Sequence, residues 1–438
     1  MHSELPRLID HLLSRLAQVR ESLGMPVSDS LIPSTPFSEI VDSMAMVEFL
    51  AIMAKDCGVE MAAIENAVQR RFTNVTELAR CLLEAGLLST SFPKTEATTI
   101  DPRSSFQQPL PSGKNQSMQG ARHGWLAATS IRLPDMVQSA DAINRIIGRP
   151  QGWLEHHAEI HSRRLWHNQD PVMAAVEAAR ECLQKVSVIP DDVGGLFVTS
   201  EAPPRLAGLE ALLHHHLQLR TEASALQIGG ACTGFLAALA VAQAMLPRIR
   251  SALIVTLEAP SQYLLLEPGE AGESAALFSD AAAACLVTAD PLRADSTPFS
   301  AVVLGVDGSG HDLIQLHQSK TGSVHLRMQG QTLAARAIHA MMHAVMDCAK
   351  RHSLTPGDLH AVVAHGGNGR MPALLARQFG LAPERVWSET AATGNLGSAS
   401  LPVAWHAHQP APDRAIIWTS VGHGLTWGSV LSGLPVLP

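Results

Sequence analysis

The sequence predicts an α/β domain of mostly buried strands, preceded by a small all-α domain. From about residue 121, short β-branched runs alternate with longer helical patterns, an order typical of α/β folds. Before about residue 88, apolar residues recur only at helical spacing. At 438 residues the chain is too long for one ordinary core. Its 46% hydrophobic and 16% charged residues are typical of a folded globular protein.

The all-α domain, residues 1–88, is expected to begin with a helix over about 4–22, where Leu8, Leu12 and Leu16 share one face. A proline-containing loop leads to a second helix from Ser43 to about residue 55, and a helix over 72–83 closes the domain. Residues 1–90 contain 12 acidic and 7 basic residues, which supply −5 of the net charge of −8. Such an acidic domain argues against nucleic acid or an anionic membrane as a partner.

Residues 89–120 predict a flexible linker, because they are rich in Ser, Thr, Pro and Gln and lack apolar periodicity. About 30 such residues have a root-mean-square span of roughly 30 Å, so one domain can reach several positions over the other.

The α/β domain covers residues 121–438. Its expected strands are the apolar runs at 194–200, 251–258, 283–289, 360–366 and 415–422. Helical patterns over 171–185 and 332–351 lie between them.

The cysteine content and the N-terminus indicate a cytoplasmic protein. The six cysteines include no CxxC pair, which argues against a disulfide framework or a structural zinc site. The first residues carry acids where a signal peptide has basic residues. The most apolar helical stretch, 235–246, is short of the roughly 20 residues that span a bilayer. The histidine clusters at 156/157/161 and 214–216 lack acidic or cysteine partners at ligand spacing, so no metal is expected.

Two positions are candidate attachment or reaction sites. Ser43 begins an amphipathic helix after Asp42, where a helix cap is the commoner role. Cys232 follows Gly229 and Gly230 at the start of an apolar helix, where the helix dipole favours a thiolate. A lone cysteine is more often a small buried hydrophobe. His365 and Asn395 stand in Gly-rich turns, AHGGNGR and TGNLGSAS, from which side chains can converge on one site.

Residues 1–88 resemble the acyl carrier protein (ACP) family, in which the serine of an Asp-Ser-Leu/Met motif receives a phosphopantetheine arm. The helix pattern and Asp42-Ser43-Met44 carry the resemblance, although Ile40-Val41 replaces the glycine usual before the aspartate. The resemblance implies a small all-α four-helix fold and covalent 4'-phosphopantetheine on Ser43, with a phosphopantetheinyl transferase as a partner.

From about Gly124 onward the chain resembles the β-ketoacyl-ACP synthase III branch of the thiolase superfamily. The order Cys232, His365, Asn395 carries the resemblance, together with the segments VDGSGHDLIQL (306–316) and GHGLTWGSVL (422–431). It implies a thiolase-like five-layer αβαβα domain with halves at about 121–300 and 301–438, and a homodimer.

The same resemblance implies a role for each site residue. Cys232 takes the acyl group as a covalent thioester. His365 and Asn395 are two neutral donors for the enolate that forms when a malonyl-type extender loses CO2. The backbone N–H groups of Cys232 and His423 form an oxyanion hole. The implied product is a β-ketoacyl thioester, as in fatty-acid or polyketide-type specialised biosynthesis.

One departure from that family bears on the acyl donor. Synthase III enzymes that use acyl-CoA usually have a Trp followed four residues later by an Arg, and a second Arg on a later loop. Trp153 is present, but His157 replaces the first Arg and residues 268–274 contain none. Two missing guanidiniums weaken phosphate binding. We therefore expect acyl-ACP and malonyl-ACP substrates, with the fused carrier as one source.

Three other functions remain open. One is acyl transfer to an alcohol or amine, which does not require Asn395. Another is non-decarboxylating head-to-head condensation of two acyl chains, which needs a carboxylate base near Cys232. Glu201 and Glu210 lie on the segment where related enzymes carry that base. A non-catalytic carrier or gatekeeper module is the third, and the presence of Cys232, His365 and Asn395 opposes it.

Overall fold

The computed structural model describes residues 5–22, 31–37, 41, 43–59, 64, 72–87, 124–201, 208–318 and 324–433. The chain divides into two compact units, one made mainly of residues 1–115 and one made mainly of the residues that follow. The linker predicted over 89–120 lies outside the described residues.

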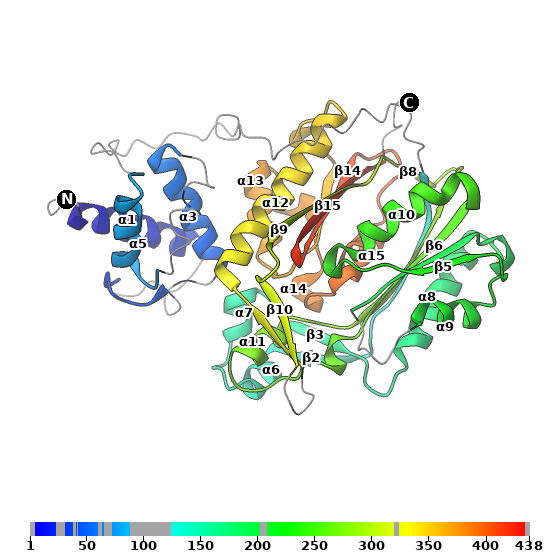
Figure 1. The fold of residues 1–438 in the computed structure, drawn as a ribbon, viewed down its shortest axis with the longest axis horizontal. Helices are drawn as coiled ribbons and strands as arrows, with labels where there is room; N and C mark the ends of the chain where they lie inside the picture. Colours follow the sequence, from blue (N-terminus) through cyan, green and yellow to red (C-terminus); the bar gives the residue numbers. More distant parts are fainter. Residues whose placement is uncertain are drawn as a thin grey trace. The chain divides into compact units, whose positions relative to one another are not determined.

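The first unit is helical throughout its described residues, with α1 (Leu5–Ser22), α3 (Ser43–Cys57) and α5 (Val75–Glu84) (Figure 1). The leucines expected to share one face of α1 are buried against Phe37 and Phe49. Asn74 caps α5, because its side-chain oxygen accepts a hydrogen bond from the backbone N–H of Glu77 at 3.0 Å. The unit thus has a hydrophobic core of its own.

The second unit contains the same five-strand arrangement twice. The strands of the first half are β1 (Gly124–Arg132), β4 (Gly195–Thr199), β5 (Ser224–Gln227), β6 (Ser251–Glu258) and β7 (Ala281–Thr288). Those of the second half are β9 (Val303–Gly310), β12 (Ala361–Ala364), β13 (Val386–Trp387), β14 (Ile416–Gly422) and β15 (Gly424–Ser432).

The pairing is identical in the two halves. In the first, β5, β4 and β6 are parallel, β7 is antiparallel to β6, and β1 is antiparallel to β7. In the second, β13, β12 and β14 are parallel, β15 is antiparallel to β14, and β9 is antiparallel to β15. The short strand β8 (Thr297–Phe299) pairs with both β1 and β15 and joins the halves. The two halves of the second unit are therefore structural repeats of each other.

Helices complete five layers (Figure 1). The central layer is α10 (Gly234–Ile249) and α15 (Ser400–His408), each of which contacts strands of both halves. On the outer face of the first sheet lie α8 (Pro171–Lys185) and α9 (Leu209–Leu217). Over the second sheet lie α12 (Gly330–Arg351), which contacts β15 through a Cys348–Ser429 hydrogen bond, and α13 (Met371–Phe379). The expected five-layer α/β architecture is confirmed.

The remaining elements surround one end of the sheets. They are the hairpins β2–β3 (Met136–Ser139, Ser162–Leu165) and β10–β11 (Ile314–Gln318, Val324–Met328), and the short helices α6 (Ala140–Ile146), α7 (Trp153–Ala158), α11 (Glu270–Ala276) and α14 (Thr390–Thr393).

Within the described residues, one helical segment, Ala231–Ile249, is apolar and long enough to cross a membrane by length and composition. Most of it is α10, which packs between the two sheets as part of the central layer.

Candidate active site

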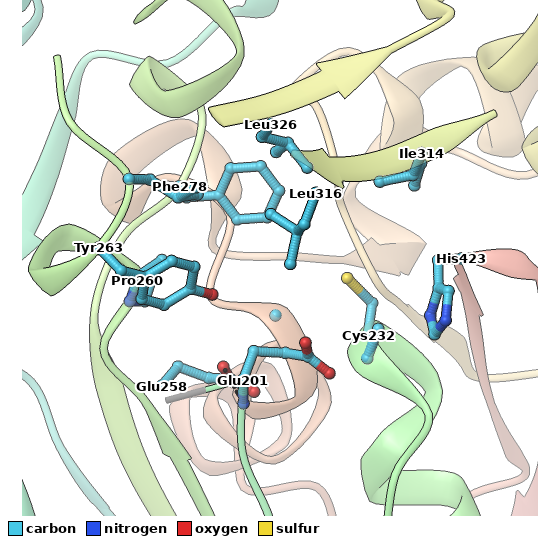
Figure 2. Close-up of a pocket in the computed structure, with 13 residues that line it drawn as sticks. Glu201, Cys232, Glu258, Pro260, Tyr263, Phe278, Ile314, Leu316, Leu326 and His423 are labelled. Atoms are coloured by element: carbon cyan, nitrogen blue, oxygen red, sulfur yellow. Dashed lines mark hydrogen bonds between the residues drawn. The ribbon is translucent and has the colours of Figure 1, made fainter. Parts of the chain in front are cut away.

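A cavity of about 280 Å³ lies beside Cys232 (Figure 2). One wall is apolar and comes largely from the β10–β11 hairpin and the segment before β7. Its residues are Leu264, Phe278, Ile314, Leu316 and Leu326. The opposite wall carries the polar groups Glu201, Glu258, Tyr263 and His423. The cavity therefore offers an apolar surface for an acyl chain and a cluster of titratable groups at the thiol.

Cys232 lies in a tight turn before α10. The turn is a 3-10 segment, η3 (Ala231–Thr233), so the α-helix begins at Gly234 and not at Cys232 as expected. Ala231 has a φ of 48°, a left-handed conformation unfavourable for a residue with a Cβ. The Thr233 hydroxyl holds the turn by donating to the Gly230 carbonyl at 2.6 Å. Backbone strain of this kind is typical of functional sites.

The prediction of a thiolate at Cys232 is wrong for the resting site. Burial raises the pKa of the Cys232 thiol, and the nearby Glu258 and Glu201 carboxylates raise it further. Desolvation disfavours the charged form of any acid, and negative neighbours add to that effect. Both effects oppose the helix dipole, which favours the thiolate. The thiol is therefore protonated at neutral pH and must lose its proton during acyl transfer.

His365 follows β12 and is only 3% exposed. Its backbone N–H donates to the Thr419 carbonyl at 3.0 Å, and its Nδ1 lies 3.2 Å from the Ser400 hydroxyl. Burial lowers the pKa of His365 to about 4, so the imidazole is neutral at physiological pH. Its Nε2 has no hydrogen-bond partner among the residues that the structure describes.

Asn395 is also buried, and one end of its amide is fixed. Its Oδ1 accepts the backbone N–H of Gly397 at 2.9 Å, while its Nδ2 donates to no described residue. Gly367 reveals where this amide points: a Cβ on Gly367 would lie 3.6 Å from His365 Nε2 and 4.0 Å from Asn395 Nδ2. The structure therefore brings these two polar groups close to the same point, next to Gly367.

The strand β14 connects this pair to the nucleophile. Ser420 donates its hydroxyl to the Cys232 carbonyl at 2.7 Å, and the preceding Thr419 accepts the His365 N–H. The 3-10 turn η7 (Gly397–Ala399), which follows Asn395, packs against η3. The predicted residues Cys232, His365 and Asn395 thus belong to one connected site.

His423 follows β14 and lines the cavity next to Cys232 (Figure 2). Its imidazole is exposed. Thr426 fixes the turn, because its backbone N–H and its hydroxyl both donate to the His423 carbonyl at 3.1 Å. The turn sets His423 beside Cys232, and the oxyanion role of its backbone N–H stays a prediction.

Two carboxylates lie next to the thiol. Glu201 lies two residues beyond the end of β4, and in Figure 2 its side chain points toward Cys232. Glu258 is the last residue of β6 and is 2% exposed. Glu258 Oε1 accepts the Ser398 N–H at 3.0 Å and the Ser398 hydroxyl, and its Oε2 accepts the Glu201 N–H at 3.2 Å. Glu210, in α9, does not line the cavity.

Burial strongly affects both carboxyl groups. It raises the pKa of Glu258 to about 8, with a smaller contribution from the charge of Glu201. Burial also raises the pKa of Glu201, while His423 and a hydrogen bond from the Ala231 backbone lower it. Two neighbouring buried carboxyls share protons as a pair. At neutral pH Glu258 holds a proton.

Sequence reasoning missed Glu258 and Tyr263. Tyr263 is the only tyrosine of the chain, and burial raises the pKa of its phenol. The signal for Glu258 was a single acid ending an otherwise uncharged buried run, SALIVTLE. For Tyr263 we find no comparable signal in the sequence.

Away from the cavity, the Trp153 ring is already in contact with two side chains. The His157 imidazole stacks on it with ring centroids 4.6 Å apart, and the Arg149 guanidinium lies 5.4 Å from its centroid. Arg149 in turn pairs with Glu273 of α11. The sequence prediction overlooked Arg149, whose guanidinium forms an ion pair with the Glu273 carboxylate.

Ser43 is the first residue of α3, as expected, while Asp42 lies outside the described residues. The described residues contain no group of three His, Cys, Asp or Glu side chains placed to hold a metal ion.

Comparison with known proteins identifies the family. The family model described as 3-oxoacyl-[acyl-carrier-protein] synthase III matches residues 226–308, and the model of its C-terminal part matches residues 349–433. The chain is 30% identical over 316 residues to β-ketoacyl-[acyl-carrier-protein] synthase III of Rhodospirillum rubrum, an alignment covering 69% of this chain and 94% of the relative.

Solved structures agree. The 3-oxoacyl-(acyl carrier protein) synthase III of Pseudomonas aeruginosa PAO1 superposes with a TM-score of 0.65 at 26% identity, over 72% of this chain and all of that one. An OleA variant of Xanthomonas campestris shares the fold, with a TM-score of 0.64 at 19% identity over 71% of this chain and 96% of that one. The thiolase-like fold is confirmed. The chain belongs to the β-ketoacyl-[acyl-carrier-protein] synthase III family of condensing transferases.

Proposed function

We propose that the protein condenses an acyl group held on Cys232 with a carrier-bound malonyl-type extender and releases a β-ketoacyl thioester. One observation supports this most strongly: neutral His365 and Asn395 both lie close to Gly367, in a site connected to Cys232. Loss of CO2 from a malonyl thioester places negative charge on the thioester oxygen, and two preorganised neutral donors stabilise such an oxyanion.

The reaction has two halves. In the first, the Cys232 sulfur attacks an acyl thioester, and the carrier thiol leaves. The backbone N–H groups of Cys232 and His423 stabilise the tetrahedral oxyanion, while the acyl chain lies against Leu316, Leu326 and Phe278. In the second, His365 and Asn395 hold the extender thioester oxygen as CO2 departs, and the enolate carbon attacks the acyl carbon on Cys232. The bond from that carbon to the Cys232 sulfur then breaks, and the released thiolate takes up a proton.

The N-terminal unit is proposed to be an acyl carrier domain with 4'-phosphopantetheine on Ser43, added by a phosphopantetheinyl transferase. Support comes from its small helical core and from the position of Ser43 at the start of α3. A tethered carrier supplies its substrate at an effective concentration in the millimolar range.

The acyl donor is proposed to arrive on a carrier protein and not on CoA. His157 stacks on Trp153, and Glu273 pairs with Arg149, so this surface presents a neutralised guanidinium to a nucleotide phosphate. Acylation of Cys232 by matched acyl-CoA and acyl-ACP donors tests this directly; faster labelling by the CoA donor contradicts it.

Condensation is tested with purified holoprotein, an acyl-ACP and a malonyl-ACP, by detecting the β-ketoacyl thioester and released CO2. The Cys232→Ala variant is the control for acyl loading and is expected to give no product. Acylation of Cys232 without product in the wild type contradicts decarboxylative condensation.

The position of Glu201 favours a second candidate, the non-decarboxylating head-to-head condensation. A carboxylate beside acylated Cys232 is placed to remove the α-proton of the bound acyl group. In that reaction two acyl thioesters condense without malonyl extender and without CO2, so the same assay distinguishes the two chemistries.

A further inference from the structure

The internal repeat relates the chain position of Glu201 to that of His365. Each half of the second unit contributes the same two chain positions to the site: the residues after its second strand and those before its central helix. In the second half these positions hold His365, after β12, and Asn395, before α15. In the first half they hold Glu201, after β4, and Cys232, before α10. By strand register the counterpart of His365 is Ser200, so Glu201 is the residue next to that counterpart, on the nucleophile's side.

The Cys232 thiol needs a proton acceptor, because burial and negative neighbours keep it protonated. His365 is a weak base, since burial lowers its pKa to about 4. Glu201 points toward Cys232 (Figure 2) and is held by the Ala231 backbone N–H, from the residue preceding the nucleophile. Burial raises the pKa of Glu201, and a carboxylate with a raised pKa is a stronger base.

We propose that Glu201 is a catalytic base of the acyl-loading half-reaction, with Glu258 as its positioning residue. The inference rests on the proposed function for its substrate, an acyl thioester, and assigns a residue to its first step.

The step balances without a co-reactant. The Glu201 carboxylate accepts the Cys232 thiol proton, and the sulfur forms a bond to the acyl carbon. When the tetrahedral intermediate collapses, the bond from that carbon to the carrier sulfur breaks. The carrier thiolate then takes the proton from Glu201 and leaves as a thiol. Glu201 is regenerated as a carboxylate.

Glu258 positions this base in two ways. Its Oε2 accepts the Glu201 backbone N–H, and its Oε1 accepts both donors of Ser398, next to the Asn395 turn. It also holds a proton at neutral pH, so that one negative charge and not two stands beside the thiol. Among the described residues, the titratable groups facing Glu201 are Cys232, Glu258, Tyr263 and His423.

The test measures single-turnover acylation of Cys232 in the full chain without phosphopantetheine, between pH 5 and pH 10, by intact mass spectrometry. The probes are N-acetylcysteamine thioesters from acetyl to decanoyl. The wild-type rate is expected to rise as the carboxyl pair loses its first proton and then to level off. In Glu201→Gln the plateau disappears, the rate rises tenfold per pH unit, and at pH 7 it falls roughly 100-fold or more.

Two variants separate this role from its alternatives. Glu210→Gln, in α9 outside the cavity, is the matched control and is expected to keep the wild-type profile. His423→Gln tests the other cavity base. Its absolute rate is expected to change, because His423 lines the cavity, but its profile is expected to retain a plateau. Alkylation of Glu201→Gln by iodoacetamide at pH 9.5 checks that Cys232 remains accessible in a folded protein.

Each outcome decides the matter. A Glu201→Gln profile parallel to that of the wild type shows a structural role and overturns the inference. Loss of the plateau in His423→Gln alone makes His423 the base and also overturns it. Acylation that persists in Cys232→Ala, or no acylation by any thioester, contradicts the proposed function as well.

Discussion

At the scale of single residues, the proposed binding of the enolate oxygen and the proposed deprotonation of the thiol use different side chains, neutral in the first case and acidic in the second. His365 and Asn395 are neutral donors, whereas Glu201 and Glu258 lie on the side of the thiol. A cationic imidazole would bind the malonyl carboxylate and oppose its loss, while a neutral one favours only the enolate oxygen. In the proposed reaction, burial of His365 keeps this donor neutral.

Removing the Asn395 amide should affect only the second half-reaction. In Asn395→Ala, one of two oxyanion donors is lost, and condensation is expected to fall about 100- to 1,000-fold. Acyl loading of Cys232 should remain within about threefold of the wild-type rate, because Asn395 takes no part in it. Single-turnover acylation and product formation, measured on the same preparation, check this. Equal losses in both steps would contradict the assignment.

Burial of Glu258 predicts a pH-dependent stability. Its pKa rises from the ordinary 4.5 to about 8 in the folded state, so the folded protein binds this proton more tightly than the unfolded chain. The stabilisation is complete below pH 4.5 and is lost as the pH rises through 8. One pKa unit corresponds to about 1.4 kcal/mol, so the loss amounts to a few kcal/mol.

The measurement is urea unfolding of wild type and Glu258→Gln at pH 5 and pH 9. Because glutamine does not titrate, the wild type should lose stability relative to the variant at the higher pH. An equal stability difference at both pH values would show that Glu258 is not buried as an acid.

At the scale of elements, the site is built where strands end and central helices begin. Gly367 illustrates how closely these turns approach. A Cβ there would lie at van der Waals distance from His365 Nε2 and Asn395 Nδ2, the two groups proposed to bind the extender. Gly367→Ala is expected to lower condensation at least tenfold with a melting temperature within a few degrees of the wild type.

Gly357→Ala serves as the control, because a Cβ at that exposed turn meets only Thr355 Oγ1 at 3.6 Å. Product assays and thermal unfolding of both variants check the prediction. Unchanged condensation in Gly367→Ala would mean that the extender does not bind between the two donors.

The sequence predicted elements well and electrostatics poorly. The strand expected at 251–258 has those bounds, and the helix expected at 171–185 is α8. Periodicity carries this information because it reflects local burial. The thiolate prediction failed at Cys232, since a helix terminus is visible in a sequence whereas desolvation depends on residues from distant strands. Glu258 was missed because the order of strands in the sheet brings the end of β6 next to Cys232, and the sequence does not show that order.

At the scale of the whole molecule, the chain joins a condensing unit to a small helical unit through a segment predicted to be a linker. If the helical unit is a tethered carrier, delivery of the extender depends on the connection and not only on affinity. Separating the two units at the linker should leave the chemistry intact and reduce the rate at micromolar protein. Adding the separate carrier at millimolar concentration should restore it. Product formation against carrier concentration measures this effect.

The most direct test of the central claim is intact-protein mass spectrometry of the phosphopantetheinylated protein, loaded with malonate on Ser43 and then given an acyl-ACP. The account predicts that Ser43 gains a mass equal to acyl plus malonyl minus CO2, and that Cys232→Ala abolishes the gain. Acylated Cys232 beside an unchanged malonyl group on Ser43 would contradict condensation with the tethered carrier as extender.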